Sequence, residues 1–316
     1  MNIPEILKNW VPYKLEGEAC RWLYTGDTRF THPFFDETIS VCRREPVNRH
    51  SRLCISDMDT MKEWSIQLDP APVKGLIFHV SRCGSTLLSQ QLSLDEKNIS
   101  LSEVPFLDEL LRWGFRHKEE KKANEYFQAA LRFYSARRTG KENAVYIKTD
   151  SWHLHFYRQM RAIFPGLPFL ILIRRPDEII RSQGKMPGMQ SVPGMIEPGI
   201  FGLDPEKLHV AEHDRHMADV LVSYYKAILE ISASDEDLVI CDYGDGMVQA
   251  FETMSRFFGL DPDQQTFERM KDRANFHAKS PGQKFEEPPL EEEPPVFLKE
   301  AMQLYRKISD LRPHAE

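Results

Sequence analysis

The stretch GLIFHVSRCGSTLLSQQLSL, residues 75–94, decides the fold class of this chain. It begins with an apolar run whose length and character are typical of a buried parallel strand: Leu76, Ile77, Phe78 and Val80. Small polar residues follow, and leucines then recur at helical spacing. The stretch therefore predicts a strand, a tight polar turn and a helix, as found at the start of an α/β domain.

The turn between this strand and helix has the character of an anion-binding loop. It places one guanidinium and neighbouring hydroxyls among small residues: Ser81, Arg82, Cys83, Gly84, Ser85 and Thr86. The first backbone N–H groups of a helix lack partners within it, and the helix dipole adds about half a positive charge there. A phosphate fits such a position. The GxxxxGK[ST] pattern of a Walker A loop is absent. The alternative is an ordinary turn in which Ser85 and Thr86 merely cap the helix.

The composition is that of an ordinary globular protein of 316 residues with a formal net charge of −7. This charge argues against general binding to nucleic acid or to anionic membranes, so we expect any polyanion site to be local. Five cysteines without CxxC or metal-ligand spacing indicate reduced thiols. The sequence shows neither a signal-like start nor an apolar run long enough to span a bilayer. We therefore expect a soluble, unprocessed, cytoplasmic protein.

Further apolar runs predict the rest of the sheet, at residues 99–102, 144–148, 169–173 and 238–241. Helical patterns alternate with these strands, which predicts a doubly wound α/β fold: a central parallel sheet flanked by helices. A charged surface helix is expected at 121–138 and a long helix at 205–231. We divide the chain into an N-terminal accessory segment packed on the core (1–72), the α/β domain (73–285), and a linker with a C-terminal helix (286–316).

Residues 184–204 form a long aperiodic segment rich in Gly, Pro and Met. Such a segment is too long for a simple connection in a compact domain, so it is expected to be functional. Methionine side chains adapt to apolar ligands. We interpret the segment as a lid or an acceptor-binding loop.

Three motifs stand in one order along the chain: strand–SRCGSTLL–helix, strand–KTD and strand–RRPDEIIRS. In this order and spacing they resemble the sulfotransferases that use 3′-phosphoadenosine 5′-phosphosulfate (PAPS). The first resembles that family's 5′-phosphosulfate loop, with Arg82 where many members have Lys or Arg. The third resembles the 3′-phosphate site, in which an Arg at a strand end and a Ser eight residues later bind the phosphate, as Arg174 and Ser182 are spaced here. The resemblance covers residues 75–284 and includes CDYGDGMVQAFETMSRFFGLD near its end.

The resemblance implies a P-loop-like sulfotransferase fold, PAPS as the donor and no metal. It implies a small-molecule acceptor with a hydroxyl or amine, such as a glycan, lipid, phenol or peptide. The implied donor contacts are Arg82, Cys83, Gly84, Ser85, Thr86, Arg174, Ser182, Arg273 and Lys279. Guanidinium groups suit phosphate geometry. No carboxylate set of the kind that holds magnesium accompanies the loop, which disfavours an ATP-dependent kinase.

Sulfonyl transfer needs a general base and a cation near the bridging oxygen. Arg82 is one candidate for the cation, and Lys148 is another because it resembles the lysine of the KTH-like turn of cytosolic members. Asp150 takes the place of the histidine in that turn. Glu103 resembles the glutamate base of the tyrosylprotein and bacterial glycolipid branches and is the first candidate base, ahead of Asp150 and then His153. Alternatively, Glu103 only interacts with a helix dipole.

Two other functions stay open at this stage. One is a non-catalytic nucleotide-binding or regulatory protein that keeps the pocket without a base, and the other is a nucleotide-dependent kinase. A metal centre is disfavoured because His79, His153 and His155 have no ordered spacing with cysteines or acids. Cys83 sits at a helix N-terminus, where a thiol can be reactive, but packing as a small residue is the favoured interpretation.

Overall fold

The computed structural model describes residues 3–49, 54–276 and 293–312. Its centre is a five-stranded sheet in which every pairing is parallel, in the order β5-β6-β4-β7-β8. The strands are β4 (Val73–His79), β5 (Asn98–Ser102), β6 (Ala144–Lys148), β7 (Phe169–Ile173) and β8 (Leu238–Asp242). The predicted α/β class with a central parallel sheet is therefore confirmed, and the strand from the deciding stretch lies in the middle of the sheet.

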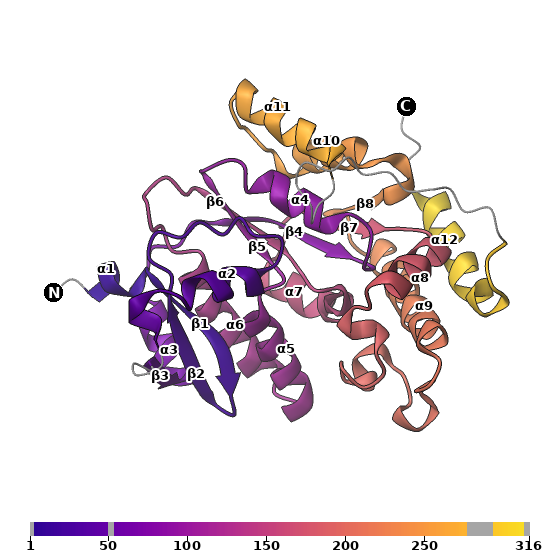
Figure 1. Cartoon of the computed structure of the whole chain (residues 1–316), viewed down its shortest axis with the longest axis horizontal. Coiled ribbons are helices and arrows are strands. Elements are labelled where there is room, and N and C mark those ends of the chain that lie inside the picture. Colours follow the sequence, from indigo (N-terminus) through magenta and orange to yellow (C-terminus); the bar gives the residue numbers. More distant parts are fainter. Residues whose placement is uncertain (1–2, 50–53, 277–292, 313–316) are drawn as a thin grey trace.

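Helices cover both faces of this sheet (Figure 1). In that view α4, α10 and α11 lie above the sheet, and α5, α6, α7 and α9 lie below it. The bounds are α4 (Ser85–Leu92), α5 (Pro105–His117), α6 (Glu120–Tyr134), α7 (Tyr157–Ile163), α8 (Pro176–Lys185), α9 (His213–Ser232), α10 (Met247–Phe258), α11 (Gln264–Asp272) and α12 (Lys299–Leu311). A 3₁₀ turn, η2 (Ser151–Phe156), precedes α7. Among the described helices, none is long and apolar enough to cross a membrane.

The core lies where the helices meet the sheet. Every residue of β7 is buried, which explains why its sequence is a continuous apolar run rather than an alternating one. Phe78 of β4 is fully buried, and its ring packs 5.1 Å from Tyr157 and 5.3 Å from Phe169. This cluster fixes β4, and with it the position of the loop that follows β4.

The N-terminal segment forms its own antiparallel sheet of β1 (Trp10–Glu16), β2 (Ala19–Tyr24) and β3 (Cys54–Asp57), with α1 (Ile3–Leu7), α2 (Phe35–Cys42) and α3 (Met58–Ser65). Aromatic rings join it to α6 of the main domain. The Trp22 ring lies 4.7 Å from Phe133, and Phe35 lies 5.3 Å from Tyr134. The segment thus shares its core with the main domain, and the boundary after residue 72 stays a proposal.

Two helices differ from their predicted extents. The predicted surface helix, α6, ends at residue 134 rather than 138. It exposes Lys121 and Lys122 at its start but buries the opposite face, where Phe133 and Tyr134 pack against the N-terminal segment. The long helix α9 begins at residue 213 rather than 205, since Pro205–Lys207 form a separate 3₁₀ turn. The boundary at 285/286 and Lys279 lie outside the described residues.

Candidate functional site

The loop after β4 has an unusual backbone at the carboxyl edge of the sheet. Ser81, Arg82 and Gly84 have φ of 74°, 51° and 84°, in the left-handed region that residues with a Cβ rarely adopt. Such strain clusters at functional sites and persists only where the surroundings enforce it. Here the Ser81 hydroxyl accepts hydrogen bonds from Gln183 (3.0 Å) and Gln190 (2.8 Å). Gln183 of α8 and Gln190, which follows that helix, therefore fix the position of the loop.

Gly84 is the N-cap residue of α4, and no side chain caps this helix. The prediction that Ser85 and Thr86 cap the helix is therefore wrong, because they occupy its first turn instead, whereas the role of the turn as an anion-binding loop stays a prediction. A Cβ built at Gly84 would lie 2.4 Å from Sδ of Met247 on α10. The backbone conformation favours glycine at this position, and a larger residue would also have to displace the end of the Met247 side chain.

Arg174 follows β7 and reaches back to the same loop. Its guanidinium donates to the carbonyl oxygen of Arg82 (2.6 Å) and to Glu178 of α8 (2.9 Å), and it lies 4.2 Å from the centre of the Tyr243 ring. The side chain is 5% exposed. Ser182 lies one turn after Glu178 on α8 and is half-buried. The structure thus brings Arg174 against the loop, as predicted, but with a carboxylate already bound to it.

Lys148 ends β6 and meets Glu103, which follows β5. The ammonium donates to the Glu103 carboxylate and lies 3.5 Å from the hydroxyl of Thr86 in the first turn of α4. The Lys148 side chain is 1% exposed and that of Glu103 23%. Burial acts to raise the pKa of Glu103, but the neighbouring Lys148 and His79 outweigh it and hold the pKa below its usual range. In this state Glu103 is an ionised, paired carboxylate and hence a weak base.

His79 is a neutral residue in the wall of the site. Its Nδ1 accepts from the backbone N–H of Ser81 (3.1 Å), so the proton resides on Nε2 and is donated to the carbonyl oxygen of Thr149 (2.9 Å). The same Nε2 lies 3.6 Å from Glu103. Burial lowers the pKa of His79, in agreement with a neutral imidazole. Both ring nitrogens of His79 are thus hydrogen-bonded within the protein.

The second candidate base, Asp150, lies in a buried polar cluster with Asp108 and His153. The His153 Nδ1 accepts from the backbone N–H of Asp150 (3.3 Å), and its Nε2 donates to Asp108 (3.0 Å). Asp108 also accepts from the Trp152 indole (2.6 Å). Burial, followed by the charges of Glu103 and Asp108, raises the pKa of Asp150 well above its usual range. Its surroundings therefore favour the neutral form of Asp150 more than water does.

Asp108, Asp150 and His153 offer ligand atoms within 4.8 Å of one another. Both ring nitrogens of His153 are engaged, one as an acceptor from backbone and one as a donor to carboxylate. In this arrangement neither nitrogen directs a lone pair to an ion. The cluster is explained as a hydrogen-bonded clamp that fixes the turn after β6.

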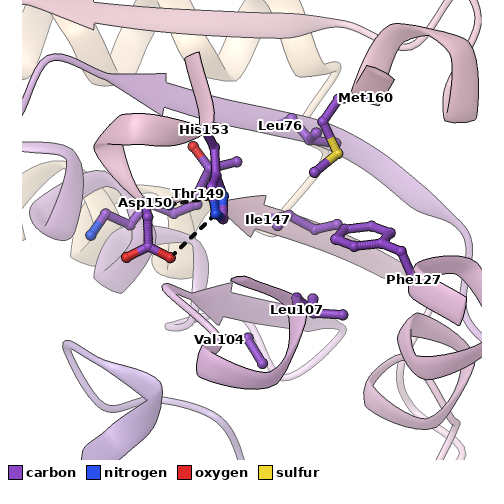
Figure 2. A pocket seen from close by; sticks show the side chains of 10 residues that line it. Leu76, Val104, Leu107, Phe127, Ile147, Thr149, Asp150, His153 and Met160 are labelled. Atoms are coloured by element: carbon purple, nitrogen blue, oxygen red, sulfur yellow. Dashed lines mark hydrogen bonds and ion pairs between the residues drawn. The ribbon is translucent and has the colours of Figure 1, made fainter. Parts of the chain in front are cut away.

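A small cavity lies beside this clamp (Figure 2). Most of its walls are apolar, and Figure 2 shows the carboxylate of Asp150 and the ring of His153 at one side, with Phe127 and Met160 at the other. Its volume is about 10 Å³, which is room for roughly one water molecule. The cavity is therefore too small for an organic ligand.

The remaining predicted donor contacts are more distant from the loop or are engaged with other groups. Arg82 donates from its guanidinium to the carbonyl oxygen of Met186. Arg273 donates to Gln90 in the second half of α4 (2.6 Å), beyond the turn that carries the loop. Cys83 is fully buried, and burial raises the pKa of its thiol to about 12, so its side chain is inert.

Some residues of the site were not found by sequence reasoning. Phe34 lies with its ring 5.2 Å from the Lys148 ammonium, and the hydroxyl of Ser102 donates to the carbonyl of Pro33 (2.7 Å), which anchors this part of the N-terminal segment. Burial and the charge of Glu103 raise the pKa of Asp36 on α2. No motif marks residues 33–36, so only the packing of the accessory segment reveals them.

The segment at 184–204 is fastened at both ends. Glu197 forms ion pairs with Arg112 (2.7 Å) and Arg116 (2.6 Å) of α5. At the other end, Met186 and Gln190 contact the loop after β4. These contacts connect the segment to the candidate site, and its role as a lid or acceptor loop stays a prediction.

His155 of η2 packs against the segment at 184–204. We expect its titration to affect the stability of the folded protein at acid pH. Its ring packs 5.7 Å from Phe201, and burial lowers its pKa to about 4. The unfolded chain binds a proton near the ordinary value of 6.5, so stability should fall as pH is lowered from 6.5 toward 4. We expect urea midpoints of His155→Phe to fall less steeply over this range. The matched variant His213→Asn, at an exposed position, should follow wild type; equal slopes for all three proteins would contradict the assignment.

No protein-family model matches the sequence, and no curated protein matches it. In structure the chain is similar to the sulfotransferase domain from the Synechococcus PCC 7002 olefin synthase, with 14% identity, a TM-score of 0.47, and 78% of this chain and 97% of that chain covered. It is also similar to the sulfotransferase domain from the curacin biosynthetic pathway (15% identity, TM-score 0.45, 78% and 100% covered). A third similar structure is a sulfotransferase from Alicyclobacillus acidocaldarius (16% identity, TM-score 0.39, 63% and 90% covered).

Proposed function

We propose that this protein is a sulfotransferase that transfers a sulfonyl group from PAPS to a hydroxyl or amine of a small-molecule acceptor. The observation that carries the proposal is the meeting of cations from three motifs at one strained loop. Arg174 donates to the carbonyl of Arg82, and Lys148 lies 3.5 Å from Thr86. A converging set of guanidinium and ammonium groups at a helix N-terminus suits a ligand with several anionic groups.

The residues of the loop fit the donor in chemical character. Arg82, Thr86 and the backbone from residue 83 to 85 would hold the 5′-phosphosulfate, and Arg174 with Ser182 would hold the 3′-phosphate. Arg273 and Lys279 remain proposed as outer contacts. When bound, PAPS supplies a sulfonyl group attached to a phosphate leaving group. Lys148 is paired with Glu103, and Arg174 is paired with Glu178. Donor binding therefore requires these two ion pairs to rearrange.

The chain supplies both electrostatic stabilisation and a base. Lys148 and Arg82 would stabilise the negative charge that develops toward the leaving phosphate, and a single such interaction is worth on the order of 3 kcal/mol in the transition state. The acceptor must lose one proton as it bonds to sulfur, and Glu103 is the first candidate to take that proton. Asp150, whose pKa is raised by burial and by the neighbouring carboxylates, is the second candidate.

Calorimetric titration with 3′-phosphoadenosine 5′-phosphate, without magnesium, tests the donor site. We expect micromolar binding to the wild-type protein, followed by sulfonyl transfer from PAPS to at least one member of a panel of phenols, amines, glycans and lipids. Absence of binding would overturn the proposal. Binding without transfer to any acceptor would favour the non-catalytic nucleotide-binding protein, and magnesium-dependent hydrolysis of ATP would favour a kinase.

A further inference from the structure

The Lys148–Glu103 ion pair stands at the point where the anion-binding loop meets the candidate base. Lys148 is buried at the end of β6, and its ammonium lies between the carboxylate of Glu103 and the hydroxyl of Thr86. Thr86 belongs to the first turn of α4, where an anion would bind. An anion in the loop would therefore compete with Glu103 for the same ammonium.

The ionised state of Glu103 depends on that ammonium. Glu103 faces Lys148 of β6, His79 of β4, Arg82 of the loop, Asp36 of α2 and Asp150 after β6. His79 is neutral by its hydrogen bonds, and Asp36 disfavours a further negative charge. Arg82 is itself an expected donor contact. Once an anion takes over Lys148, burial is the largest single influence left on the pKa of Glu103, which it raises, while His79 opposes it.

We propose that Lys148 holds Glu103 in an inactive ion pair, and that binding of the anionic donor to Lys148 releases Glu103 to act as the general base. The inference rests on the proposed function. As the acceptor oxygen or nitrogen bonds to sulfur, its proton passes to the Glu103 carboxylate, and the sulfur–oxygen bond to the phosphate breaks with its electron pair on the phosphate. His79, whose Nε2 lies 3.6 Å from the Glu103 carboxylate, is the positioning residue that faces the released carboxylate.

This arrangement makes the base dependent on the donor. In the free protein a paired carboxylate accepts protons poorly, so bound water is not activated at the loop. After donor binding, the same carboxylate has lost its partner in a buried site, where its proton affinity is higher. The Lys148–Glu103 ion pair would thus restrict base catalysis to the complex that contains the donor.

Proton uptake on nucleotide binding tests the proposal without any turnover. The full-length protein is titrated with 3′-phosphoadenosine 5′-phosphate in buffers of different ionisation enthalpy, between about pH 5 and pH 7, the range into which burial shifts a carboxyl group. We expect the wild-type protein to take up more protons than Glu103→Gln, which has no carboxyl group to protonate. Loss of a nearby negative charge also changes the titration of the bound phosphate, so Asp36→Asn, which loses a charge but keeps Glu103, is titrated beside the two proteins.

The affinity of the same ligand gives a second readout. Glu103→Gln removes the competitor for Lys148, so it should bind the nucleotide at least about tenfold more tightly. Asp36→Asn is the matched control because it removes a negative charge that faces the same site without contacting Lys148. It should tighten binding much less and should keep the proton uptake of wild type. Glu103→Ala, with the same expected proton uptake as Glu103→Gln, serves if the glutamine variant does not fold.

The outcomes separate this inference from the proposed function. Nucleotide binding with equal proton uptake by wild type and Glu103→Gln would overturn the proposed release of Glu103 and leave the donor site intact. Equal tightening by Asp36→Asn and Glu103→Gln would also overturn it, because a general charge effect would then suffice. Failure of the wild-type protein to bind the nucleotide would instead overturn the proposed function.

Discussion

Replacement of Arg174 by alanine should weaken binding of 3′-phosphoadenosine 5′-phosphate by about 10- to 150-fold. This is the loss expected for one charge-assisted contact of roughly 1.5–3 kcal/mol. Arg174 is almost fully buried, and its guanidinium also holds the carbonyl of Arg82 in the strained loop. The variant therefore loses both a phosphate contact and the support of the loop. Calorimetric titration of the variant beside wild type measures the effect.

Arg175→Ala is the matched control for this measurement. Arg175 is the next residue, and its guanidinium pairs with Asp177 (2.6 Å) while 41% of the side chain is exposed. Its removal changes the net charge by the same amount without touching the loop, so the affinity should change less than about threefold, within the range of a screened surface charge. Comparable losses in both variants would mean that Arg174 acts only through the overall charge.

Gly84→Ala should strongly weaken nucleotide binding and lower the free energy of unfolding by about 1–4 kcal/mol. Two costs add at this residue. A φ of 84° is unfavourable for any residue with a Cβ, and the new atom would overlap Sδ of Met247 at 2.4 Å. Movement of the Met247 side chain can relieve part of this overlap, and the rest would displace the first turn of α4, whose N-cap residue is Gly84. Urea unfolding and nucleotide titration measure the two effects.

Gly140→Ala separates the two costs. Gly140 has a similar φ of 80°, but nothing lies within 4 Å of the position that a Cβ would occupy. It should lose only the backbone contribution of about 1–2 kcal/mol and should bind nucleotide like wild type. The double variant Gly84→Ala with Met247→Ala should recover stability relative to Gly84→Ala alone. A Gly84→Ala protein no less stable than Gly140→Ala would show that the overlap with Met247 of α10 costs no measurable stability.

Local sequence patterns were sufficient to predict the sheet and the loop. The apolar runs that became β4 and β7 are continuous because both faces of a central parallel strand are buried, and no amphipathic alternation competes with that signal. Pro176 begins α8 and Gly259 ends α10, since a fixed φ and a left-handed φ suit those two positions. Each of these features depends on residues close together in the chain.

Local patterns could not predict which side chains of the site contact each other, because crossover connections bring together residues that are distant in sequence. Glu103 and Lys148 are 45 residues apart and meet only because β5 and β6 are neighbours in the sheet. Their ion pair reverses the effect of burial on the pKa of Glu103, so the identity of the residue at 103 does not reveal its basicity. Phe34 reaches Lys148 from the N-terminal segment, which carries no motif. Local sequence was thus sufficient to identify the candidate residues of the site. Their charge states depend on desolvation and on contacts that exist only after the sheet has formed.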